Sequence, residues 1–108
     1  MQRLADETFK RITLSFYRYV IIAEPQAFRD ELYIQLDELN CLGRIYVARE
    51  GINAQMSVPA HQLEAFLHVL ESNPYLKNMP IKYAVEDDGK SFYRLIVLLK
   101  NRQLLEYL

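Results

Sequence analysis

Residues 43–59 read GRIYVAREGINAQMSVP, and their pattern carries the strongest structural signal in the chain. Apolar and polar residues alternate on both sides of Glu50-Gly51, a dipeptide that suits a tight turn. We therefore predict two strands, over residues 43–49 and 52–58, that share one apolar face and one polar face. The polar face would carry Arg44, Tyr46, Asn53, Gln55 and Ser57.

The segments around this hairpin predict two helices and three more strands. Helices are expected over residues 25–40 and 59–73, and strands over 12–22, 81–85 and 92–99. The last two strands flank Asp88-Gly89, which favours a hairpin turn. The expected fold is an α+β, ferredoxin-like β-α-β-β-α-β sandwich. Both helices would cover one face of an antiparallel sheet, with an extra strand in a C-terminal hairpin.

Length and composition fit one soluble domain. The chain has 108 residues and a formal net charge of -1, which argues against a strongly basic nucleic-acid module but allows a local basic face. We expect a single domain over 1–108 with an ordered core at about 12–100. Cys41 is the only cysteine, which suits a reducing cytoplasm, and neither a signal peptide nor a membrane span is expected.

Few residues suggest catalysis or metal binding. His61 and His68 would lie roughly 10 Å apart on one helix, too far to share a zinc ion. The acidic run 86–88 is better explained as a solvated turn, and Cys41 as a buried structural thiol. Arg29 is the only candidate for an acylphosphatase arginine, and no glycine-rich loop accompanies it. We expect no metal and no cofactor in this domain.

The polar face of the sheet is the more suggestive feature. Ser15, Tyr17 and Tyr19 in the first strand share the phase of this face. Exposed aromatic residues on such a sheet stack unpaired RNA bases, and Asn and Gln hydrogen-bond their edges. The alternative is that the same tyrosines pack against another domain or a second copy, because aromatic residues also mark protein interfaces.

Four blocks of the sequence resemble the rhodanese-related tRNA uridine hydroxylase family. They are residues 15–19, 28–33, 43–59 and 84–92, in the expected order and covering about residues 13–100. The resemblance implies an acylphosphatase-like N-terminal domain. In this family such a domain precedes a rhodanese domain that carries the catalytic cysteine, and the enzymes hydroxylate carbon 5 of the wobble uridine of tRNA with molecular oxygen.

The resemblance therefore implies an accessory domain that recognises or positions tRNA. The rhodanese domain is absent from this chain and Cys41 does not match its catalytic cysteine, so we expect no catalytic residue here and no activity from the domain alone. The candidate RNA-binding residues are Arg44, Tyr46, Asn53, Gln55 and Lys90, with Tyr17, Tyr19 and Ser57 in secondary roles. Expected partners are tRNA, the rhodanese domain and a second copy. The alternatives are a docking or dimerisation domain and, as a distant third, an acylphosphatase.

Overall fold

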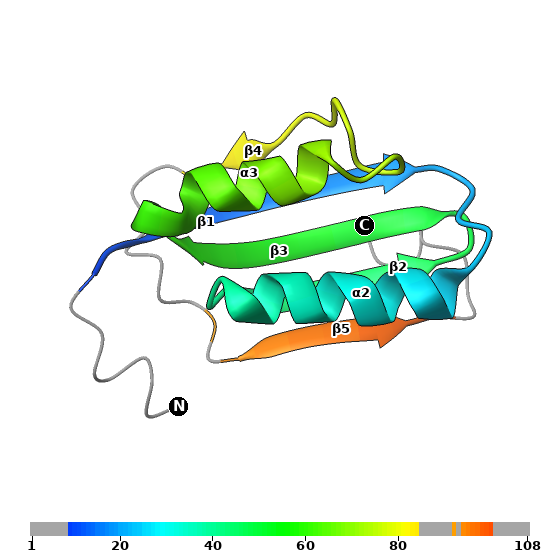
Figure 1. Ribbon diagram of the computed structural model, residues 1–108, viewed down its shortest axis with the longest axis horizontal. Helices are drawn as coiled ribbons and strands as arrows, with labels where there is room; N and C mark the ends of the chain where they lie inside the picture. The colour runs from blue at the N-terminus through cyan, green and yellow to red at the C-terminus, as the bar shows by residue number, and fades with distance from the viewer. Residues whose placement is uncertain (1–8, 85–91, 93, 101–108) are drawn as a thin grey trace.

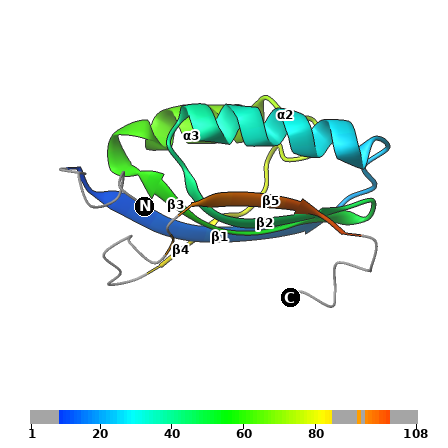
Figure 2. The ribbon, with the colours of Figure 1, turned by 90° about the horizontal axis from the view of Figure 1, so that it is seen from below.

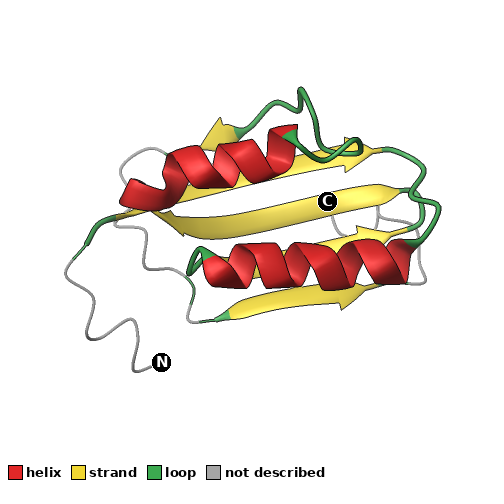
Figure 3. Cartoon of the chain, viewed as in Figure 1, coloured by secondary structure: helices red, strands yellow, loops and turns green. Residues whose placement is uncertain are grey.

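The computed structural model describes residues 9–84, 92 and 94–100, which form two layers. The elements are β1 (Arg11–Tyr19), α2 (Pro25–Glu38), β2 (Leu42–Ala48), β3 (Gly51–Pro59), the 3-10 turn η1 (Ala60–Gln62), α3 (Leu63–Glu71), β4 (Lys82–Tyr83) and β5 (Leu95–Leu99). Both helices run side by side across one face of the sheet (Figures 1 and 3). Seen edge-on, they lie on the same side of all five strands (Figure 2).

The sheet has the strand order β4-β1-β3-β2-β5. β3 pairs antiparallel with both β1 and β2, and β4 pairs antiparallel with β1. This arrangement, with its two helices, confirms the predicted α+β ferredoxin-like sandwich.

The place of the fifth strand differs from the prediction. β5 does not lie beside β4 in a hairpin; it lies at the opposite edge of the sheet and pairs parallel with β2. There Val97 becomes buried beneath α2, and Nε of Arg29 on α2 donates a hydrogen bond to the Val97 carbonyl oxygen at 2.7 Å. Val97, with the partly buried Leu95, thus extends the core under α2.

The core lies between the helices and the apolar face of the sheet. Phe28, Leu32 and Leu36 form the buried stripe of α2, at the helical spacing seen in the sequence. α3 contributes Phe66 and Leu70 to the core. The helix predicted from Pro59 begins instead as the 3-10 turn η1, and the regular α-helix starts at Leu63. The sheet supplies the remaining buried residues, among them Leu14, Phe16, Ile45, Val47, Ile52, Ala54, Met56 and Val58.

Two residues with positive φ position the central hairpin. Asn40 has φ 60° just after α2, a conformation that asparagine tolerates, and it turns the chain into β2. Gly51 has φ 153° at the turn between β2 and β3, where a Cβ would clash with the carbonyl oxygen of Arg18. A residue with a side chain would therefore separate β3 from β1 at this point.

β4 is shorter than the strand predicted over 81–85. Within the described residues it pairs with β1 through Leu14↔Tyr83 and Ser15↔Lys82, and the Ala84 N–H also donates a hydrogen bond to the Thr13 carbonyl oxygen at 2.9 Å. The turn predicted over 86–89 lies outside the described residues. Although β4 is short, it brings Lys82 to the face opposite the helices, where the candidate site lies.

Candidate nucleic-acid interface

The strand register places the predicted polar residues in two rows across the sheet. One row runs Ser15, Gln55, Arg44, and the next runs Tyr17, Asn53, Tyr46. Residues that pair across a ladder share a face, so both rows lie opposite the helices. Tyr17 and Tyr19 are 57% and 52% exposed, which shows that this face presents large aromatic side chains to solvent.

Two further cations border these rows. Lys82 pairs with Ser15 and so extends the first row, while Nζ of Lys100 lies 5.0 Å from the centre of the Tyr46 ring. Neither lysine was among the predicted site residues, although Lys82 alternates visibly with the apolar residues Ile81 and Tyr83 in the sequence. We call the assembled surface the platform. It comprises Ser15, Tyr17, Tyr19, Arg44, Tyr46, Asn53, Gln55, Lys82 and Lys100.

Contacts within the platform hold several side chains in place. Nη1 of Arg44 donates a hydrogen bond to the Tyr46 hydroxyl at 3.4 Å. The rings of Tyr17 and Tyr19 meet edge to face, with centroids 6.1 Å apart. Rings held in this way lose little conformational freedom when a planar ligand stacks on them.

Charge is segregated between the two layers of the molecule. The platform carries Arg44, Lys82 and Lys100, and no aspartate or glutamate occupies this face in the strands that the structure describes. The helix layer holds the carboxylates Asp30, Glu31, Asp37, Glu38, Glu64 and Glu71. A net charge of -1 therefore conceals a locally basic face.

One of the predicted residues, Ser57, does not join the exposed part of this face. Ser57 has the predicted phase but is 0% exposed, and its carbonyl oxygen accepts a hydrogen bond from Nη1 of the buried Arg11 at 3.2 Å. We therefore remove Ser57 from the candidate contact residues. Lys90 lies outside the described residues, so its prediction is not tested.

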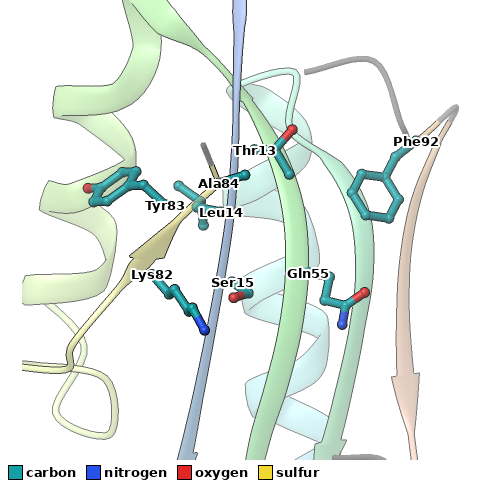
Figure 4. A pocket seen from close by; sticks show the side chains of 8 residues that line it. All are labelled: Thr13, Leu14, Ser15, Gln55, Lys82, Tyr83, Ala84 and Phe92. Atoms are coloured by element: carbon teal, nitrogen blue, oxygen red, sulfur yellow. The ribbon is translucent and has the colours of Figure 1, made fainter. Parts of the chain in front are cut away.

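The platform is hollowed beside β4. A pocket of about 320 Å³ is lined by residues of β1, β3 and β4 together with Phe92 (Figure 4). Lys82, Ser15 and Gln55 follow one another across three neighbouring strands at its lower side in this view. A second pocket, of about 700 Å³, shares these three residues and continues toward Tyr17 and Asn53.

The contacts of Cys41, His61 and His68, the other titratable candidates, are those of structural residues. Cys41 is fully buried, and burial raises the pKa of its thiol to about 12, with Arg11 acting in the opposite direction. A thiol in that state is a poor nucleophile at neutral pH. His61 packs edge to face on Phe9, and Nε2 of His68 lies 3.4 Å from the Ser72 hydroxyl.

Arg29 connects the helix layer with the sheet, because it lies on α2 and bonds to Val97 on β5. Besides its bond to Val97, Nη1 of Arg29 contacts a carboxylate oxygen of Asp30 at 3.1 Å, and its guanidinium lies 5.2 Å from the centre of the Tyr33 ring. These contacts give Arg29 a structural role.

In the described part of the chain, no group of three His, Cys, Asp or Glu residues could hold a metal ion. Among the same residues, no helix is long and apolar enough to cross a membrane.

Comparison with known sequences identifies relatives of this chain. Residues 11–102 match the family described as the UPF0176 acylphosphatase-like domain. The tRNA uridine(34) hydroxylase of Leptospira interrogans is 52% identical over 101 residues, covering 94% of this chain. That of Pectobacterium carotovorum is also 52% identical, over 93% of this chain. The chain spans 28% of the length of each relative. The resemblance noted in the sequence is thus confirmed.

Comparison with solved structures supports the fold. Full-length HypF in its phosphate- and nucleotide-bound form matches with a TM-score of 0.64 at 13% identity, over 89% of this chain and 13% of that one. The BLUF domain of BlrP1 matches with a TM-score of 0.59 at 13% identity, over 86% of this chain and 66% of that one. At such identities the likeness extends to the fold alone.

Proposed function

This chain belongs to the UPF0176 acylphosphatase-like domain family, and from that premise we propose that it is the N-terminal accessory domain of a tRNA uridine(34) hydroxylase. In this role the platform recognises or positions tRNA, and hydroxylation takes place in another part of the full-length protein. The observation that carries the proposal is the collection of cations and exposed tyrosines on one sheet face without a described carboxylate among them.

Each kind of side chain on the platform suits a different part of an RNA strand. Arg44 and the flanking lysines are placed to contact phosphates, which supply most of the salt-dependent affinity for nucleic acid. The tyrosines offer π-faces to unstacked bases, and the amides of Asn53 and Gln55 can read base edges. Phosphate contacts would position the domain, and base contacts would discriminate among RNAs.

A salt titration of this chain against unmodified tRNA, followed by fluorescence anisotropy, tests the proposal. We expect affinity to fall steeply with salt, and Arg44→Ala/Tyr46→Ala to weaken binding by at least about tenfold. Lys77→Ala is the matched control, because Lys77 is an exposed cation in the segment after α3, away from the platform. Equal tRNA affinity of the folded double variant and the wild type would contradict the assignment.

A second candidate function is supported by the exposed apolar groups of the same face. Leu98 pairs with Tyr46 and is 36% exposed, and together with Tyr17 and Tyr19 it resembles the core of a protein interface. The face would then dock on the rhodanese domain or on a second copy of this chain. In that case Tyr17→Ala/Tyr19→Ala would lower the melting temperature of the full-length protein or its association state while leaving tRNA affinity unchanged.

An acylphosphatase activity is the third and weakest candidate. Such a site needs an arginine free to hold an acyl phosphate beside a glycine-rich loop, whereas Arg29 is engaged by Val97 and Asp30. We expect no hydrolysis of an acyl phosphate by this chain. A measurable rate that disappears in Arg29→Ala would reinstate this candidate.

A further inference from the structure

The larger hollow of the platform is lined by aromatic, apolar, amide and cationic side chains. It lies between β1, β3 and the segment that leads into β4, and we call it the edge pocket. Its volume of about 700 Å³ falls within the range of roughly 300–1,000 Å³ that is typical of small-ligand sites. The smaller pocket of about 320 Å³, whose lining residues Figure 4 shows, shares Ser15, Gln55 and Lys82 with it.

The walls of the edge pocket divide by chemistry. Tyr17 supplies an aromatic ring, and Pro80 and Ile81 supply an apolar surface. Asn53 and Gln55 supply amides that both donate and accept hydrogen bonds. This combination matches a flat, apolar ring system with polar edges.

Two cations lie along one row of the platform. Lys82 lines the pocket, and Arg44 lies farther along the same row, with Ser15 and Gln55 between them, so the two stand three strand spacings, or about 14 Å, apart. Neither forms an ion pair with a carboxylate among the residues that the structure describes. Two separated cations suit successive phosphates of a strand that crosses the sheet better than they suit one small anion.

We propose that the edge pocket binds a single unpaired nucleotide of an RNA strand. The base lies against the Tyr17 ring, Asn53 and Gln55 hydrogen-bond its edge, and Lys82 contacts its phosphate. The strand continues across the sheet toward Arg44. A base-paired nucleotide is excluded because its face and its pairing edge are already used within the duplex. This inference rests on the proposed function, since it specifies which part of the tRNA meets the platform.

The test uses a short single-stranded RNA that carries the fluorescent base 2-aminopurine, and the same RNA annealed to its complement. The single strand should bind this chain with a change in 2-aminopurine fluorescence, and the duplex should bind more weakly. Tyr17→Leu should weaken binding of the single strand roughly 5- to 100-fold and abolish the fluorescence change. Tyr17→Phe keeps the π-face and should preserve both.

Two further variants test the other contacts. Lys82→Ala should reduce the salt dependence of binding by about one phosphate contact, whereas the control Lys77→Ala should not. Gln55→Ala removes an exposed side chain and should lower affinity without affecting the fold. It serves as a second test if Tyr17→Leu proves unstable.

The outcomes separate this inference from the function on which it rests. If tRNA binds in an Arg44-dependent manner but Tyr17→Leu and Gln55→Ala bind the single strand as tightly as the wild type, the pocket assignment is wrong and the platform stands. Equal affinity for single strand and duplex would also overturn it. If neither tRNA nor the oligonucleotide binds at low salt, both proposals fail together.

Discussion

Replacing Gly43 with alanine tests how closely β2 must approach β3. Gly43 pairs with Met56 and has φ 136°, a conformation that residues with a side chain rarely adopt. A Cβ at this position would lie 2.7 Å from the Met56 Cα and would clash with the carbonyl oxygen of Gln55. Both obstacles are backbone atoms, so the strands themselves would have to move.

The expected loss of stability follows from two costs and one smaller gain. Forcing alanine into a glycine-only backbone region costs roughly 1–3 kcal/mol, and overpacking costs a similar amount. The lower chain entropy of the unfolded state returns roughly 0.4–1 kcal/mol. We therefore expect Gly43→Ala to lower the free energy of unfolding by about 1–5 kcal/mol, a substantial part of the roughly 5–15 kcal/mol typical of a domain.

The assay is urea unfolding followed by circular dichroism, with thermal melting as a second measurement. A loss of this size should lower the melting temperature by at least about 4 °C. Because the clash involves the Gln55 backbone, adding Gln55→Ala should not restore stability. A Gly43→Ala protein that melts within about 2 °C of the wild type, or a rescue by Gln55→Ala, would refute this reasoning.

Two other predictions concern the core. Phe66 is fully buried beside Phe16. In urea titrations, Phe66→Ala should therefore lower the free energy of unfolding by about 3–5 kcal/mol, and Phe66→Leu should lower it by clearly less. Equal losses for the two variants would show that Phe66→Ala leaves no cavity. Cys41 has a pKa raised from 9.0 to about 12, so its protonated thiol favours the folded state. This contribution to stability is complete below pH 9 and declines as the pH rises toward 12, so the wild type should lose stability above pH 9 more steeply than Cys41→Ala. A thiol reagent should also label the native protein slowly at pH 8. Parallel pH profiles of the two proteins, or rapid labelling, would contradict the burial of Cys41.

The faces of the central hairpin were predictable because side-chain alternation is a local property. Ile45 and Val47 are fully buried and Arg44 is exposed, as the period of two required. The buried stripe of α2 likewise followed from its helical period. The part of the platform on β2 and β3 followed from the same reasoning, because a tight turn fixes the register of the two strands that it joins. The register of β1 against β3 came only from the structure.

Exposure along a predicted face was less predictable. Ser57 has the same phase as Gln55, yet it is buried and bonded to Arg11, while Gln55 is exposed. Alternation states which side of the sheet a residue occupies. It does not state what else covers that side, because the covering groups come from distant parts of the chain.

The helices, the strands, the polar face of the sheet and the family could all be inferred from the amino-acid sequence. The parallel pairing of β5 with β2 and the position of Lys82 beside Ser15 emerge only in the folded molecule. Hydrophobic periodicity states which side of a strand is buried, but it does not state which strand lies next to it. The choice of edge depends on which apolar surface is left to cover, here the space beneath α2 that Val97 fills, and that surface exists only once the rest of the sheet has formed.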